Sequence, residues 1–216
     1  KETIVGRGEG HHRHKKQSGG RGQFGEVYLR VEPMPPENED WFVNKIVGGA
    51  IPSNFIPAVQ KGLVEGMQTG PQAGYPLQGV RVELYDGSFH AVDSSEVAFK
   101  IAGARALRAA TAAAKPALLE PIMVVDITVP EQFMGDVSGD LSHKRGRIQG
   151  MAAEGGMQVI TAEVPKAELS RYSSELRSIT GGRGTFEMKF VRYDTVPGNV
   201  AQSIIEQAEQ DKADEH

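Results

Sequence analysis

Two spacings of apolar residues alternate along this chain, and together they predict strands and helices in a mixed order. Between residues 24 and 31 apolar and polar side chains alternate singly, the pattern of a half-buried strand. Between residues 53 and 68 apolar side chains recur every three or four positions, which predicts a helix. The same reasoning places strands at 41–47 and 80–85. It also places an alanine-rich helix from a capping box at 93–96, with Asp93 as the cap, to Pro116.

The second half of the chain predicts a different order of elements. Strands are expected near 123–129, 148–153, 160–164 and 186–190, and helices over 130–144 and 169–176. The order β-α-β-β-α-β is the ferredoxin-like arrangement. We therefore expect an α/β (α+β) chain with domains at 1–118 and 119–196, then a terminal helix and acidic tail at 197–216.

Composition narrows the possible classes of protein. The chain has 216 residues, 39% of them hydrophobic, which suffices for one large or two small cores. It contains no cysteine and no run of 18 apolar residues, so we expect no disulfide framework, no membrane contact and a cytoplasmic location. Because it begins at Lys1 rather than Met, we expect a fragment of a longer protein.

Charge is distributed unevenly although the net charge is only −4. Residues 7–21 contain five Lys or Arg and three His against a single Glu, whereas residues 203–216 contain five acidic side chains against one Lys. A basic arm on a mildly acidic body is typical of a local nucleic-acid contact. The alternative is a solvated, disordered arm.

The stretch Gly19–Val27, "GGRGQFGEV", matches the glycine-rich loop of protein kinases. The other kinase motifs (HRD, DFG and APE) do not occur. A dinucleotide fold requires a strand before the glycines and a helix after them, whereas here a polar, basic run precedes them and a strand is expected after them. Two interpretations remain. The glycines form a flexible loop that enters a hairpin, or they let a bulky partner approach the backbone, where Arg21 can bind a phosphate.

Candidate catalytic chemistry is sparse, so we expect a binding protein rather than an enzyme. His11, His12 and His14 could bind a metal, but no acidic ligand or cysteine accompanies them, and phosphate contact or disorder fits them better. The loop at 86–91 presents Ser88, Phe89 and His90 between a strand and a helix. Lys144 and Arg145 lie in a basic turn that could meet an RNA backbone, or simply end a helix in solvent.

Several longer stretches, among them "QSGGRGQFGEV", "LYDGSFHAVDSS" and "ELRSITGGRGTFEM", are similar to the C-terminal domains four and five of bacterial translation elongation factor G. The resemblance covers nearly the whole chain. It implies an elongated unit like domain 2 of ribosomal protein S5, then a ferredoxin-like sandwich and a C-terminal helix. The family's GTPase domain lies upstream, so no GTP, Mg or other cofactor and no metal is expected in this part.

The resemblance also implies partners and site residues. It implies a monomer that binds the ribosome, through rRNA and stalk-base proteins, and tRNA and mRNA, with the tip of domain four entering the decoding site during GTP-driven translocation. The implied contact residues, with the basic turn added, are Ser18, Gly19, Gly20, Arg21, Gln23, Ser53, Asn54, Gly87, Ser88, Phe89, His90, Lys144 and Arg145.

Two departures from the family pattern leave the role open. The common motif reads histidine-aspartate where this chain has His90-Ala91, and the basic entry segment is richer in His and Lys. Both features resemble elongation-factor-G-like paralogues, which would act on ribosomes in recycling or stress. A generic RNA-binding module that uses the basic arm alone is the third alternative.

Overall fold

The computed structural model describes residues 1–17 and 19–215, and the chain forms two compact units. The first unit comprises Lys1–Leu118 and the segment from Val196 onward, and the second comprises Leu119–Thr195. The chain passes from one to the other within a single long strand, β6 (Pro116–Pro130). Each unit has a hydrophobic core of its own.

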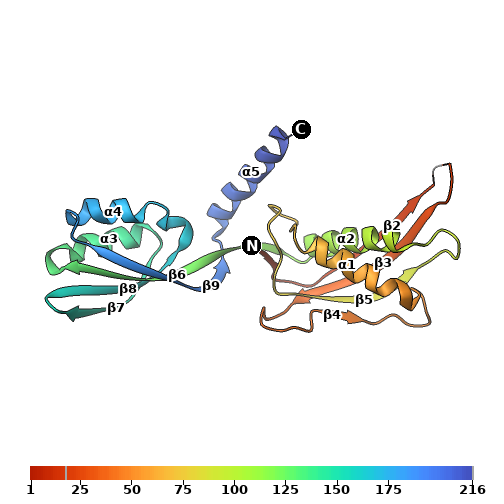
Figure 1. Cartoon of the computed structure of the whole chain (residues 1–216), viewed down its shortest axis with the longest axis horizontal. Helices are drawn as coiled ribbons and strands as arrows, with labels where there is room; N and C mark the ends of the chain where they lie inside the picture. The colour runs from red at the N-terminus through yellow and green to blue at the C-terminus, as the bar shows by residue number, and fades with distance from the viewer. Residues whose placement is uncertain (18, 216) are drawn as a thin grey trace. The chain divides into compact units, whose positions relative to one another are not determined.

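A four-stranded sheet forms the first unit, with α1 (Ile56–Gly66) and α2 (Glu96–Ala113) packed on one face (Figure 1). The strand order is β2 (Gly8–Lys16), β3 (Gln23–Pro33), β5 (Val80–Ser88) and β4 (Phe42–Asn44). The first three strands are antiparallel, and β4 is parallel to β5. The strand expected at 41–47 is therefore shorter than predicted, and β5 continues into the segment expected to be a loop.

The predicted alternation places the core of this unit between sheet and helices. Val27, Leu29 and Val31 of β3 point toward the helices and are at most 2% exposed. They pack with apolar residues of both helices, including Leu63 and Phe99. Their polar neighbours lie on the opposite face, as the period-two pattern predicts.

The strand β2 corrects an expectation, because residues 8–16 are not a disordered arm. They pair with β3 over the whole of their length, from Gly8 opposite Val31 to Lys16 opposite Gln23. A Cβ at Gly8 or Gly10 would overlap the backbone carbonyl oxygen of Ala110 or Ala106 in α2. The strand therefore packs on the helix without side chains at these two positions, and the apolar alternation that identifies a strand is missing from its sequence.

Glu2, in the short strand β1 (Glu2–Ile4), is a completely buried carboxylate in the first unit. Its Oε1 accepts hydrogen bonds from the backbone N–H groups of Gln72 (2.7 Å) and Ala73 (3.3 Å), and its Oε2 accepts one from Tyr75 (2.8 Å). Burial of the charge is compensated by these three donors. The contact fastens β1 to the loop that follows α1.

The second unit is a ferredoxin-like sandwich, as predicted. Its sheet has the order β9 (Thr185–Thr195), β6, β8 (Met157–Pro165) and β7 (Arg147–Glu154), with all neighbours antiparallel. The helices α3 (Met134–His143) and α4 (Tyr172–Thr180) cover one face (Figure 1). Buried Val125, Ile127, Ile160 and Leu176 belong to its core.

Short 3-10 turns precede three of the helices, at Ser53–Phe55, Glu131–Phe133 and Lys166–Leu169. The last helix, α5 (Gly198–Asp214), groups with the first unit and continues through most of the acidic tail. Among the described residues, no helix is long and apolar enough to cross a membrane.

Candidate functional site

The end of the first unit is built around a ring stack between two segments distant in the sequence. Phe24 of β3 and His90 of the loop after β5 have ring centroids 4.1 Å apart and planes inclined by 22°. Phe24 is only 2% exposed, whereas His90 is exposed. The guanidinium of Arg13 lies 5.3 Å from the Phe24 ring centroid. The buried ring thus fixes the position of an exposed imidazole.

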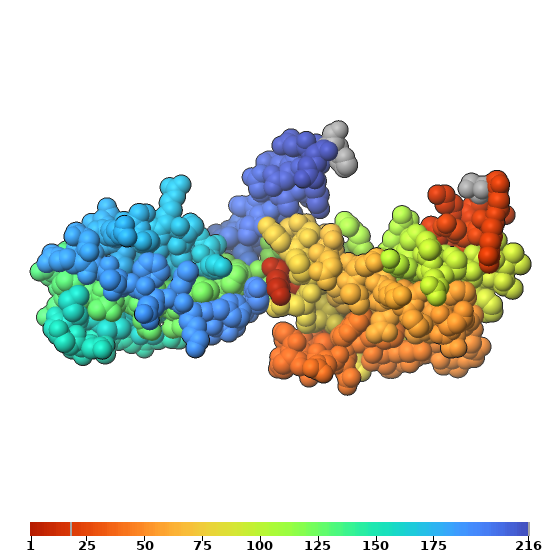
Figure 2. Space-filling model, viewed as in Figure 1, coloured from red at the N-terminus to blue at the C-terminus, as the bar shows by residue number. Residues whose placement is uncertain are grey.

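Backbone contacts hold the same two segments together. The N–H of Phe24 donates to the carbonyl oxygen of Asp93 (3.0 Å), and Arg21 Nε donates to that of Val92 (3.1 Å). Arg21 is exposed, and its guanidinium carries five N–H donors, of which this bond uses one. Figure 2 shows the end of the β2–β3 hairpin, in red and orange-red, beside the yellow-green segment of the second loop.

The loop that carries His90 is ordered by serines rather than by Asp93. Ser94 Oγ accepts a hydrogen bond from the N–H of His90 (2.8 Å), and Ser95 Oγ caps α2 by accepting from the N–H of Ala98 (3.2 Å). The prediction that Asp93 caps the helix is therefore wrong. The Asp93 carboxyl lies instead against Gly22, where a Cβ would come within 3.0 Å of it.

Two further predicted residues, Gln23 and Ser88, form side-chain hydrogen bonds with residues of β2 and β3. Gln23 Oε1 lies 2.8 Å from His14 Nε2, so the ring nitrogen donates to the amide oxygen. Ser88 Oγ donates to Glu26 (2.8 Å), which also contacts His11 Nε2 (2.9 Å). Burial favours the neutral acid at Glu26, but the hydrogen bonds from His11 and Ser88 outweigh it and lower the pKa of this carboxyl.

The other predicted tip residues lie in the same region or are exposed. Gly87 lies against the buried Ile51, because a Cβ at Gly87 would come within 2.6 Å of the Ile51 side chain. Ser53 and Asn54 follow Ile51 in the sequence and are exposed at the start of the helical segment. Gly19 is exposed and has φ of 51°, a left-handed conformation that glycine adopts without strain. Gly20 and Phe89 are also exposed, and Ser18 lies outside the described residues.

Lys144 and Arg145 lie in the second unit and have intramolecular partners. Arg145 binds both carboxylate oxygens of Glu120 (2.6 and 3.0 Å), and its Nε contacts Glu168 (3.0 Å). Lys144 contacts Asp140 (3.2 Å) and Glu175 (2.5 Å). At Lys144 burial lowers the pKa, but the bonds to Glu175 and Asp140 outweigh it and raise the pKa, whereas at Arg145 the bond to Glu120 is the largest cause of a raised pKa, again against burial. The structure thus gives both residues a folding role, and their contact with RNA stays a prediction.

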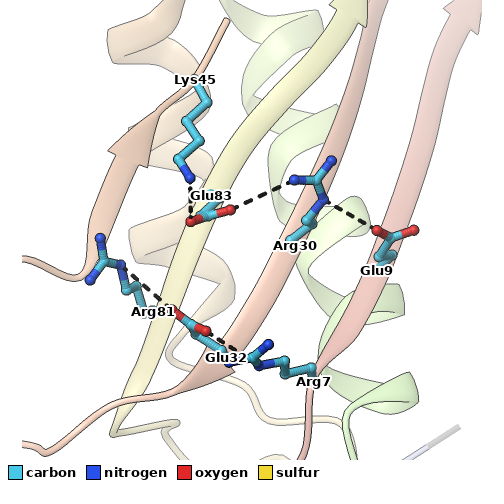
Figure 3. Close-up of polar contacts among 7 residues, drawn as sticks. All are labelled: Arg7, Glu9, Arg30, Glu32, Lys45, Arg81 and Glu83. Carbon is cyan, nitrogen blue, oxygen red and sulfur yellow. Dashed lines mark hydrogen bonds and ion pairs between the residues drawn. The ribbon is translucent and has the colours of Figure 1, made fainter.

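The outer face of the first unit's sheet carries a ladder of ion pairs (Figure 3). Its members are Arg7–Glu32, Arg30–Glu9, Arg30–Glu83, Lys45–Glu83 and Arg81–Glu32, with N–O distances between 2.9 and 3.9 Å. Arg30 also lies over the Tyr85 ring, 4.0 Å from its centroid. Each cation of this ladder thus has a carboxylate partner, and the ladder is close to electrically neutral.

Sequence reasoning missed Phe24 and Arg13, although their positions carry a signal. Phe24 stands where the alternation of β3 requires an outward side chain, and an outward aromatic residue next to a glycine loop indicates a covering segment.

No group of three or more His, Asp or Glu in the described parts of the chain is placed to hold a metal ion. The described end of the first unit presents exposed donors and rings, among them Arg21, Phe89 and His90.

Comparison with known proteins identifies the class of protein to which such a pair of units belongs, a translation factor. Residues 1–115 match the family described as elongation factor G, domain IV, and residues 117–204 match elongation factor G C-terminus. The chain belongs to the elongation factor G family. It is similar to a protein of known crystal structure from Thermus thermophilus, with 42% sequence identity and a TM-score of 0.84. That match covers 97% of this chain and 31% of the Thermus protein.

Proposed function

We propose that this chain is the ribosome-binding C-terminal part of a translocase, and that its first unit contacts tRNA and mRNA in the decoding site. The observation that carries the proposal is the Phe24–His90 stack, which joins the hairpin and the second loop into one end surface. Arg21, His90 and Phe89 are exposed on that surface. Guanidinium and imidazole groups can bind phosphates, and exposed rings can stack on bases.

The mechanism that we propose is occupation of a site rather than bond chemistry. The end surface fills the position that the tRNA–mRNA duplex leaves and disfavours its return. A surface that performs this task must keep its shape while the tRNA–mRNA duplex presses against it. The buried Phe24 ring and the Ser94 and Ser95 hydrogen bonds supply that rigidity.

The chemistry of the cycle belongs, in this proposal, to a GTPase domain outside these residues. GTP and Mg²⁺ would bind there, and the two units described here would use no cofactor. We further propose that the chain acts as a monomer, with rRNA and stalk-base proteins as the partners of the second unit.

A hybrid protein tests the proposal. This chain is joined to the GTPase half of a standard elongation factor G, and single-turnover movement of mRNA is followed on ribosomes. We expect rapid movement that slows when His90→Ala is introduced. Normal folding with GTP turnover but no mRNA movement would contradict the translocase assignment.

The same experiment addresses the second candidate, a paralogue that acts in ribosome recycling or stress. The observation that favours it is Ala91, which is exposed beside His90 where the common motif has aspartate. In this case the hybrid would hydrolyse GTP on ribosomes without moving mRNA. Restoring the carboxylate with Ala91→Asp would then be expected to restore part of the movement.

A further inference from the structure

We propose a second RNA-binding surface, the seam between β2 and the exposed flank of α2, which would bind the phosphate backbone of an RNA duplex. It consists of His12, His14 and Lys16 on the helix-facing side of β2 and of Arg105 and Arg108 on α2. The inference rests on the proposed function, since it extends the RNA contact from the tip along the side of the unit.

The fold brings the two rows of cations together. Gly8 and Gly10 allow β2 to lie directly against Ala110 and Ala106, so the strand and the helix run beside one another. Arg105 and Arg108 are three residues apart and therefore lie on one side of the helix. Both are exposed, as is Lys16 at the far end of β2. The seam thus has basic side chains on both of its sides, on the strand and on the helix.

The charges of the seam are not neutralised within the described chain. The side-chain nitrogens of Lys16, Arg105 and Arg108 take part in no ion pair or hydrogen bond there. The only acidic residue of α2 is Glu96 at its start, and Glu9 of β2 contacts Arg30 on the opposite face. The ladder on that opposite face pairs each of its cations (Figure 3), so the ladder and the seam differ in unpaired charge although both contain arginines.

The positive charges of the seam also affect the pKa of His12. It is lowered first by burial, and then by the charges of Arg105 on the helix and of His14 and His11 on the strand. A phosphate placed on the seam would relieve this repulsion, because an anion stabilises protonated imidazole. Exposed cations without counter-charges are the usual footprint of nucleic-acid binding.

The chemistry favours the backbone of a duplex over bases. The seam residues carry no phenyl, phenol or indole ring, so the large apolar rings of a stacking platform for unpaired bases are missing from it. The tyrosine rings of this sheet, Tyr28 and Tyr85, lie beside His11 and Arg30 on the other face. Contacts to phosphates position a protein without reading sequence. We therefore expect binding that is independent of base sequence.

The test measures affinity of the full 216-residue chain for a fluorescein-labelled RNA hairpin, between about 50 and about 200 mM KCl. The seam variant is Arg105→Gln/Arg108→Gln. The control is Arg7→Gln/Lys45→Gln, which removes the same charge from the ladder, where both side chains are more than half exposed. Each phosphate contact contributes roughly 0.7 to 0.9 to the slope of log K against log salt.

We expect the seam variant to lower that slope by about 1.5 and to weaken binding at least tenfold at the lowest salt. The control is expected to keep the slope and most of the affinity of the unmodified chain. Equal losses in the two variants would overturn the inference, because net charge alone would then explain binding. So would no loss in either, or stronger binding to an acidic peptide than to RNA.

The outcome is separable from that of the hybrid experiment. If the hybrid moves mRNA but the seam variant binds RNA as the control does, the seam inference fails and the proposed function stands. If the hybrid fails while the seam variant alone loses RNA affinity, the seam binds RNA for another purpose. Thermal unfolding of each variant verifies that the fold is retained.

Discussion

Phe24 and His90 are 66 residues apart in sequence, and their rings stack with centroids 4.1 Å apart. The Phe24 ring is buried and the His90 ring is exposed. Packing of the buried ring therefore fixes the position of the exposed imidazole. The hairpin and the second loop are consequently one surface rather than two independent loops. This relationship makes Phe24 a positioning residue for the proposed RNA contact.

The first prediction concerns Phe24→Leu, which keeps an apolar side chain but removes the stack. We expect a loss of about 1 to 2 kcal/mol in the free energy of unfolding, measured in urea, because packing and the ring contact are both reduced. We also expect slower mRNA movement by the hybrid, as for His90→Ala. The control is Phe55→Leu, which removes a different stack, with Phe99. Equal slowing in the control would show that stability alone matters.

The second prediction concerns Gly10→Ala in β2. Its Cβ would overlap the carbonyl oxygen of Ala106, so the strand must move away from α2. We expect the free energy of unfolding to fall by about 2 kcal/mol or more. The control Gly150→Ala adds a Cβ with no heavy atom within 4 Å and should stay within about 0.5 kcal/mol. Comparable stability of the two variants would contradict the close packing.

The third prediction separates folding from RNA binding at Arg145. Arg145→Gln leaves Glu120, only 8% exposed, without its bidentate partner. We expect a loss of about 2 kcal/mol or more in unfolding free energy, and unchanged affinity for the RNA hairpin. The neighbouring Arg147→Gln, at an exposed position, serves as the matched control. A clear loss of RNA affinity in Arg145→Gln alone would contradict this prediction and support Arg145 as a contact residue.

The fourth prediction is that pH affects stability and RNA affinity in opposite directions through His12. Its pKa is lowered in the fold, so the folded state favours neutral imidazole. The resulting stability is complete above the ordinary histidine pKa of about 6.5 and is lost as pH falls through the lower folded value. RNA affinity should instead rise over this window, because protonated His12 adds charge to the seam. His12→Gln should flatten the pH dependence of affinity, and an unaltered profile would contradict the role of His12.

Much of the fold follows from the sequence because side-chain periodicity reports which face is buried. The alternation in β3 and the helical spacing before Met67 correctly predicted their elements, and the β-α-β-β-α-β order predicted the second unit. Strand β2 was missed because its inward positions are glycine and histidine, so hydrophobicity carries no signal there. A glycine pair that permits close packing cannot be told from a flexible linker without knowing what lies beneath it.

The candidate site was less accessible to sequence reasoning. Exposed loop residues such as Arg21 and His90 could be named, since glycines and polar side chains mark loops. The buried partner Phe24 could not be assigned a role, because its contact depends on the loop after β5 folding over β3. The intramolecular partners of Arg145 could not be predicted either, because the topology brings Glu120 and Glu168 to it from distant parts of the sequence.

The buried Glu2 has a mechanical consequence. Its carboxylate is fastened by the N–H groups of Gln72, Ala73 and Tyr75, so the beginning of the chain is anchored rather than tethered loosely. A domain joined ahead of Glu2 would transmit force directly to β1 and to the loop after α1, with little slack to absorb it. Displacement of such a domain would therefore move the first unit as a rigid body. A Glu2→Gln substitution would weaken the connection at β1 without altering the surface formed by Phe24 and His90.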